Sequence, residues 1–170
     1  EGRAWAQDFA GLTQGGPSFS AMWKKVAARD PAEFGKAQHR YIERTHYEVQ
    51  VKQIQKLSGL DVKARSRALQ DVAWSVAVQH GPSTKLIANV VIALPQKPAD
   101  PVFEKALITA IYGERGKRDP DGKLHYFRNS SDNFQDGVAN RFVREFKDAL
   151  DMLTAEQALA TATLIHSATP

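Results

Sequence analysis

The sequence contains no cysteine among its 170 residues. Without cysteine the chain forms no disulfide framework, offers no thiolate ligand for zinc and has no cysteine nucleophile. Its stability must therefore come from an ordinary hydrophobic core, and a chain of 170 residues is long enough to bury one. The lack of cysteine leaves the redox compartment open, because such a chain tolerates oxidising and reducing surroundings equally.

Long hydrophobic runs are also missing. The longest, from Val72 to Val78, is much shorter than the roughly 20 residues that a membrane-spanning helix needs, so membrane insertion is not expected. The first residues have neither the basic start nor the apolar stretch of a secretory signal. What is present is the composition of a globular domain, with 42% hydrophobic residues, 25% charged residues and a net charge of +4.

Helix signals recur along the chain, and no repeat or long linker divides it. Asp30 followed by Pro31 predicts a helix start, and Gly59 is typical of a helix end. Apolar spacing and capping residues predict helices from residue 31, over 48–58, 61–80 and 101–113, from 131 onward and from 154 onward. Residues 124–127 are compatible with a short strand or a loop. The sequence therefore predicts one all-α domain over residues 1–170.

The helix predicted over 61–80 is the most informative one. It is apolar around nearly its whole circumference between residues 72 and 78, which is typical of a helix at the centre of a fold. Asp71, Ser75 and Gln79 nevertheless follow one another at four-residue spacing, and His80 comes next. Buried polar groups cost about 1–3 kcal/mol when they lack partners. This polar line is therefore expected either to hydrogen-bond to neighbouring helices or to face a wet cleft.

Spacing disfavours two kinds of site. His39 and His46 lie seven residues apart, which is too far for two histidines on one helix to share an ion, so no metal is expected. The sequence also has no glycine-rich phosphate-binding loop, and no cofactor is expected. Asp71, Ser75 and His80 contain the residue types of a serine triad. A serine within a helix lacks the strained turn that exposes such a nucleophile, and the triad is rejected.

Charged residues are compatible with two other kinds of function. Glycosidases cleave with a pair of carboxylates, and periodicity does not choose among the glutamates of this chain. The candidates are Glu33, Glu43, Glu104 and Glu114. Basic residues gather over 52–67 and 115–128, a pattern that suits a polyanionic partner. A solvated helix face explains the same charges, and a net charge of +4 is modest for a nucleic-acid partner.

Several short segments resemble the chitosanase-like branch of the lysozyme superfamily, which includes phage-type cell-wall hydrolases and type VI secretion effectors. The most distinctive is WSVAVQHG at 74–81, which is similar to the family's W-S-x-A-V-Q-H-G helix. The resemblance covers about residues 5–153. The other segments are FSAMWK (19–24), AARDPAEF (27–34), AQHRYI (37–42), THY (45–47), IYGERG (111–116), GVANRF (137–142) and Glu145 with Ala149 and Leu150.

This resemblance implies a lysozyme-like helical domain around the helix at about 61–80 that hydrolyses the glycan strands of peptidoglycan. The family's catalytic glutamate precedes a serine-, tyrosine- and glycine-containing stretch that this sequence lacks, and Glu1 does not match it. The catalytic glutamate is therefore expected upstream of residue 1, and this chain alone is expected to be inactive. The resemblance implies substrate-binding roles for Trp74, Ser75, Gln79, His80, His39, Tyr41, His46 and Tyr47.

The same resemblance implies a location and a set of partners. A protein of this kind would be secreted by a contact-dependent machine and would act in the periplasm of the target cell. Its implied partners are peptidoglycan glycan strands, a secretion-spike protein and an immunity protein, whereas nucleic acid is not favoured. The alternative function is a basic, non-catalytic module that binds cell-wall polymer or nucleic acid.

Overall fold

The structure is a computed structural model that describes residues 5–167, with side chains from residue 5 to residue 163. Glu1 lies outside the described residues. The α-helices of the described chain are α1 (Pro17–Arg29), α2 (Pro31–Ile42), α3 (Glu48–Ser58), α4 (Arg67–His80), α5 (Leu86–Ala93), α6 (Phe103–Arg115) and α7 (Asp132–Ser167). Short 3-10 turns cover Gln7–Phe9, Val62–Ala64 and His125–Phe127, and a π-helical turn covers Glu43–Tyr47.

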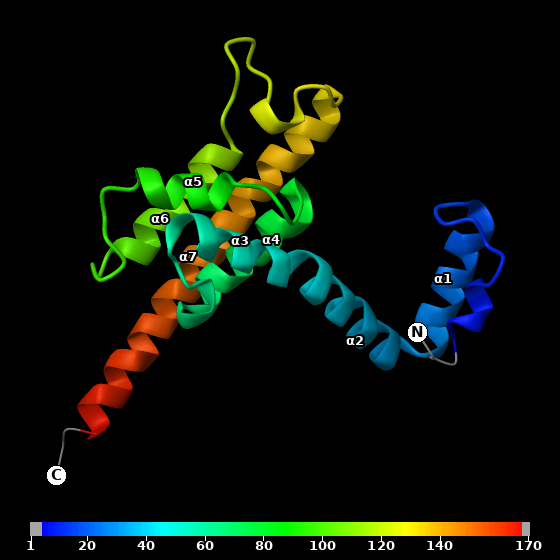
Figure 1. Cartoon of the computed structure of the whole chain (residues 1–170), viewed down its shortest axis with the longest axis horizontal. Helices are drawn as coiled ribbons and strands as arrows, with labels where there is room; N and C mark the ends of the chain where they lie inside the picture. Colours follow the sequence, from blue (N-terminus) through cyan, green and yellow to red (C-terminus); the bar gives the residue numbers. More distant parts are fainter. Residues whose placement is uncertain (1–4, 168–170) are drawn as a thin grey trace. The chain divides into compact units, whose positions relative to one another are not determined.

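The described residues contain no β-strand. One isolated antiparallel bridge joins Arg118 to Leu124. The prediction of an all-α fold is confirmed, whereas helical content alone does not establish a lysozyme-like arrangement. The structure divides into two compact units, Glu1–Arg44 and Thr45–Pro170, and each is described by itself (Figure 1).

The Glu1–Arg44 unit contains α1 and α2. Pro17 and Pro31 occupy the first positions of the two helices, where the missing N–H of proline costs no hydrogen bond. Asp30 ends α1 because a residue before proline is disfavoured in the helical region, and its φ and ψ are −141° and 61°. Its side chain makes no cap hydrogen bond. Asp30–Pro31 therefore marks the helix start through backbone geometry alone.

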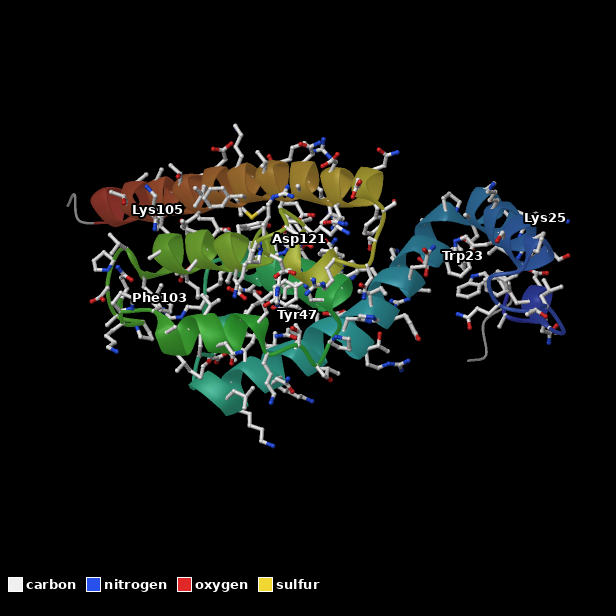
Figure 2. All side chains as sticks on the ribbon, turned by 90° about the horizontal axis from the view of Figure 1, so that it is seen from above. Trp23, Lys25, Tyr47, Phe103, Lys105 and Asp121 are labelled. Atoms are coloured by element: carbon white, nitrogen blue, oxygen red, sulfur yellow. The ribbon has the colours of Figure 1, made fainter. Side chains whose placement is uncertain are left out.

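The core of this first unit consists mainly of aromatic rings. The indole ring of Trp23 lies 4.8 Å from the ring of Phe34, and Trp5 meets Phe34 edge to face at 4.9 Å. Phe9 lies 5.0 Å from Phe19. Phe34 is buried, whereas Trp23 remains 38% exposed and is visible on α1 in Figure 2.

The Thr45–Pro170 unit is built around α4. The apolar side of this helix is completely buried, and its residues there are Ala68, Leu69, Val72, Ala73, Val76 and Ala77. α7 packs against both α4 and α6, and its C-terminal part extends past them (Figure 1). The prediction of a buried central helix is therefore correct for residues 67–80.

Three helix boundaries differ from the prediction. The segment over 61–80 is interrupted, because Asp61 caps the turn Val62–Ala64 and Ser66 then caps α4. α6 begins at Phe103 and not at residue 101. No new helix starts at Thr154: α7 continues through it, and the Thr154 hydroxyl donates to the Leu150 carbonyl at 2.8 Å.

Candidate functional site

A cluster of polar side chains lies where α4, α6 and α7 meet. Its centre is Arg115, the last residue of α6, whose side chain is completely buried. The guanidinium lies over the ring of Phe142 at 4.2 Å and over that of Tyr112 at 4.9 Å. Such stacking favours a buried arginine, because the faces of aromatic rings are electron-rich. Arg115, Glu145, Ser75, Gln79 and Tyr112 together are called the Arg115 cluster below.

Hydrogen bonds connect the Arg115 cluster across the three helices. One Arg115 nitrogen donates to Glu145 Oε2 at 3.1 Å, and the Ser75 hydroxyl donates to the same oxygen at 2.8 Å. The other terminal nitrogen of Arg115 reaches Ser75 Oγ at 3.1 Å and Gln79 Oε1 at 3.2 Å. The polar line of α4 therefore finds protein partners at Ser75 and Gln79, while Asp71 is exposed.

The carboxylate of Glu145 has further donors. The hydroxyl of Tyr112 lies 3.4 Å from Oε2, and Arg141 Nε donates to Oε1. Burial alone would raise the pKa of Glu145, but hydrogen bonds from Arg141 and Ser75 and the charges of Arg115 and Arg141 hold that pKa below its usual value. Burial raises the pKa of Tyr112. Glu145 is therefore ionised at neutral pH and Tyr112 is a hydroxyl donor.

His80 lies at the end of α4 among aromatic rings. Its ring is 5.1 Å from Tyr126, 5.6 Å from Phe127 and 6.2 Å from Phe142. Its Nε2 atom is buried without a hydrogen-bond partner among the described residues. Burial and then the charge of Arg115 lower the pKa of His80 to about 4. The imidazole is therefore neutral at pH 7.

Ser75, Gln79 and His80 are thus brought together, whereas the other predicted site residues lie elsewhere. Trp74 packs against the core and its ring lies 5.5 Å from that of Tyr47. Tyr47 is buried, with its hydroxyl 3.4 Å from Gln70 Oε1. His46 Nδ1 lies 2.8 Å from the Thr45 hydroxyl. Figure 2 labels Tyr47 in this unit.

His39 and Tyr41 belong to α2 in the other unit, and both are exposed. The prediction that all eight residues bind one substrate is untested by this geometry. Ser75 and Gln79 belong to the Arg115 cluster, and His80 lies beside Phe142, one of the rings on which Arg115 stacks. The aromatic Trp74 and Tyr47 contribute to packing.

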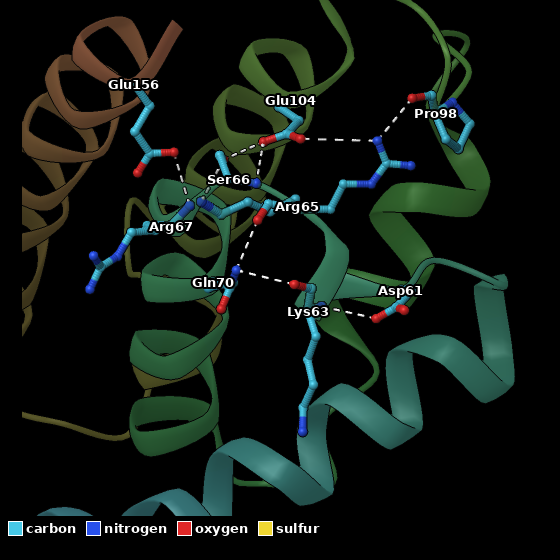
Figure 3. A network of polar contacts seen from close by, with 10 residues as sticks. Asp61, Lys63, Arg65, Ser66, Arg67, Gln70, Pro98, Glu104 and Glu156 are labelled. Carbon is cyan, nitrogen blue, oxygen red and sulfur yellow. Dashed lines mark hydrogen bonds and ion pairs between the residues drawn. The ribbon is translucent and has the colours of Figure 1, made fainter. Parts of the chain in front are cut away.

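A second polar network surrounds the start of α4 (Figure 3). The Ser66 hydroxyl accepts from the Leu69 backbone N–H at 3.1 Å and donates to Glu104 of α6. Glu156 of α7 accepts from the Arg67 backbone N–H at 3.0 Å. Glu156 thus accepts from a free backbone N–H at the start of α4, and Glu104 accepts from the cap residue Ser66. Both carboxylates lie at a helix N-terminus, which carries partial positive charge.

Three of the four candidate glutamates make local contacts. Glu104 supports the start of α4, and Glu114 accepts from the Tyr126 hydroxyl at 2.7 Å. Glu33 pairs with Lys36 on the exposed side of α2 at 2.8 Å. Glu43 lies in the π-helical turn. Glu33, Glu104 and Glu114 therefore have structural partners.

Sequence reasoning assigned no site role to the two charged residues at the centre of the cluster, Arg115 and Glu145. Leu107, Ile111 and Arg115 share one side of α6, and the first two are completely buried. An arginine that continues an apolar stripe at four-residue spacing is the signal that could have identified Arg115. Glu145 lies on α7 between the buried Phe142 and Ala149 and gives a similar signal.

The Arg115 cluster is suited to holding helices together. The Glu145 carboxylate accepts several hydrogen bonds, and the Arg115 guanidinium stacks on two aromatic rings. The Ser75 hydroxyl both donates and accepts a hydrogen bond. Within residues 5–163, no group of three or more histidine, aspartate and glutamate side chains could hold a metal ion. No helix in the described part of the chain is long and apolar enough to cross a membrane.

Comparisons with known proteins identify the family. The family model described as type VI secretion system spike protein VgrG3-like, C-terminal, matches residues 2–146. The type VI secretion system spike protein VgrG3 of Vibrio cholerae serotype O1 is 38% identical over 81 residues. That alignment covers 48% of this chain and 8% of the spike protein, so the chain corresponds to a small part of the relative's length.

These matches correct the interpretation based on the lysozyme superfamily. The family is a spike-protein domain and not a lysozyme-like effector domain, so the prediction that this chain belongs to a lysozyme-type peptidoglycan hydrolase domain is wrong. The alternative of a basic binding module for cell-wall polymer or nucleic acid has no support in them either. The expected type VI secretion context is retained. The chain belongs to the family of C-terminal domains of VgrG3-like type VI secretion system spike proteins.

Proposed function

We propose that this chain is the C-terminal domain of a type VI secretion spike protein and leaves the producing cell as part of that spike. The match of a spike-protein family model to residues 2–146 carries this proposal. The identity to the Vibrio cholerae spike protein supports it, because the aligned segment makes up 48% of this chain.

In this role the domain is structural. The hydrogen bonds of the Arg115 cluster join α4 to α7, α6 to α7 and α6 to α4. The network at Ser66 links the start of α4 to α6 and α7 a second time. Two networks at opposite ends of α4 favour a domain that stays folded while attached to a larger protein.

The destination is part of the same proposal. A domain carried by a contact-dependent spike would enter the neighbouring cell, and the periplasm is the first compartment beyond the outer membrane of such a cell. The spike protein itself is then the main partner. Because the hydrolase prediction is wrong for this chain, peptidoglycan is not proposed as its substrate. An immunity protein is not proposed as a partner either.

A secretion assay tests this function. The parent protein carries an epitope at its C-terminus in a bacterium with an active type VI system and in a matched strain without that system. Immunoblots of medium and cells should detect the epitope outside the first strain only, with a cytoplasmic protein as the control for lysis. Equal amounts in both media would contradict the proposal.

A further inference from the structure

A small groove lies beside α5, and its lining residues belong neither to the Arg115 cluster nor to the network at Ser66. One wall consists of four residues on one side of α5 and the other of Glu114 and Tyr126. The volume of the groove is about 240 Å³. Small-molecule sites usually have about 300–1,000 Å³, so this groove suits a side chain of a protein segment better than a complete ligand. The four residues of α5 are Leu86, Asn89, Val90 and Ala93.

The α5 wall is mainly apolar. Leu86, Val90 and Ala93 are hydrophobic, and they recur with the spacing of one helix face. Ala93 is the last residue of α5, so the groove includes the end of the helix that carries partial negative charge. An apolar side chain would lose water against this wall, and a cation would be favoured at the Ala93 end.

The opposite wall is acidic. The hydroxyl of Tyr126 donates to Glu114 Oε1 at 2.7 Å, and the Lys117 ammonium lies 3.9 Å from the same oxygen. The Glu114 side chain is 33% exposed, so its carboxylate remains accessible to solvent. The Lys117 side chain is 53% exposed, so its long ion pair is weak and an incoming cation can compete with it. Phosphate groups would be repelled by this carboxylate.

The geometry points to this groove as a docking site for a protein segment in which an apolar side chain is followed by arginine or lysine. The apolar side chain packs against Leu86, Val90 and Ala93. The basic group then reaches the Glu114 carboxylate, where an arginine would form a charge-assisted hydrogen bond. The inference depends on charge complementarity and groove size, and it stands independently of the spike assignment.

Binding of capped dipeptides to the full chain tests the docking site. The probes are N-acetyl-leucyl-arginine amide and its neutral counterpart N-acetyl-leucyl-glutamine amide, followed by backbone amide shifts in NMR titrations. The arginine probe should shift the amides of Asn89, Ala93 and Tyr126 with millimolar affinity. Its affinity should exceed that of the neutral probe by about tenfold, which corresponds to one charge-assisted hydrogen bond.

Two substitutions and a matched control assign the effect to the groove. Glu114→Gln keeps an acceptor for Tyr126 and removes the charge, so it should reduce the arginine probe to the affinity of the neutral one. Ala93→Phe should fill the groove and weaken both probes, and its free spectrum reports whether it folds. Asp151→Asn removes an exposed carboxylate on α7 and should change neither affinity.

Several outcomes would overturn the docking site. The first is an absence of shifts at the three groove amides with the arginine probe. Equal affinity for the two probes, or unchanged binding in Glu114→Gln, would show that the carboxylate selects nothing. A loss in Asp151→Asn as large as that in Glu114→Gln would show that the probe responds only to net charge.

Discussion

At the scale of single residues, we expect the completely buried Arg115 to make the largest individual contribution to the free energy of unfolding. Arg115→Met keeps much of the side-chain volume but leaves Gln79 and one side of Glu145 without their charged donor. Breaking a buried pair from one side costs about 3–5 kcal/mol, and the 23% exposure of Glu145 favours the lower end. Urea unfolding followed by circular dichroism measures the loss in the free energy of unfolding.

Arg141→Met is the matched control for Arg115→Met. Arg141 donates to the same carboxylate, but its side chain is 48% exposed. Its removal should cost about 1 kcal/mol or less, because exposed ion pairs contribute little. Similar losses in the two variants would contradict the assignment of Arg115 as the centre of the cluster.

His80 gives the fold a dependence on pH. Its folded pKa of about 4 lies below its ordinary value of 6.5, so the unfolded chain takes up the proton first on acidification. Its contribution to stability is complete above pH 6.5 and is lost progressively as the pH falls toward 4. Glu145, whose pKa is lowered, adds a loss at more acidic pH, and the raised pKa of Asp71 acts in the opposite direction.

The variant His80→Phe separates the effect of His80 protonation on stability from the effects of Glu145 and Asp71. Phenylalanine keeps a ring among Tyr126, Phe127 and Phe142 and removes the buried nitrogen that lacks a partner. The urea midpoint of the unsubstituted chain should fall between pH 7.5 and pH 5 by more than that of His80→Phe. The same fall in both proteins would show that His80 does not cause it.

Residue-level prediction succeeded where a polar residue interrupts an apolar helix. Ser75 and Gln79 stand out on α4 because their neighbours are hydrophobic, and both indeed find partners in the protein. The partners themselves could not be predicted, because Arg115 and Glu145 lie 30 residues apart in the sequence and meet only through the packing of α6 on α7. The prediction of substrate binding depended on the resemblance and not on contacts.

At the scale of elements, the cap of α4 illustrates how one hydroxyl supports a helix. Ser66→Ala removes the acceptor for the Leu69 N–H and the contact with Glu104. The loss in the free energy of unfolding should be about 1–2 kcal/mol, the upper part of the range for a cap. Thermal and urea unfolding measure it.

Asp30→Ala is the matched control for Ser66→Ala. Asp30 occupies the cap position of α2, but its side chain makes no cap hydrogen bond. The change should therefore cost less than about 0.5 kcal/mol. A loss equal to that of Ser66→Ala would contradict the cap assignment.

The length of α7 gives a second prediction for an element. Leu153 is the last buried residue among the described side chains of α7, and Glu156 still supports the start of α4. The described side chains from 157 to 163 are all exposed. A chain that ends after residue 157 should therefore keep its stability within about 0.5 kcal/mol, as measured by urea unfolding.

Ending the chain after residue 148 is the comparison. This truncation also removes the buried Ala149 and Leu153, and it removes the carboxylate of Glu156. It should cost about 3 kcal/mol or more, in the range of large-to-small core changes. Equal stability of the two truncated chains would show that the end of α7 does not pack on the core.

Helix prediction worked best where backbone geometry is local. α3 ends at Gly59 because only glycine adopts its φ of 75° without strain, and its predicted bounds of 48–58 are those observed. The signal at Thr154 failed because capping-box spacing also occurs inside a continuous helix. No glycine or proline occurs between Thr154 and the end of α7 at Ser167, so nothing in the sequence would stop the helix there.

At the scale of the whole molecule, the all-α class follows from helix signals spread along the chain, whereas the function did not follow from its motifs. Val76 and Ala77 of the tryptophan-containing motif on α4 are completely buried, and Trp74 packs on Tyr47. A motif made of packing residues indicates shared structure more directly than shared chemistry. Such packing residues therefore did not support the prediction of a lysozyme-type hydrolase, and the match to the spike-protein family corrects it.

The most direct test of the spike assignment is mass spectrometry of the spike protein recovered from the medium of cells with an active type VI system. The account predicts that peptides from both the spike body and residues 5–146 of this chain occur in one polypeptide of full length. They should be missing from the medium of a matched strain that lacks the system. Secreted spike protein without these peptides, or the same peptides in the medium of both strains, would contradict it.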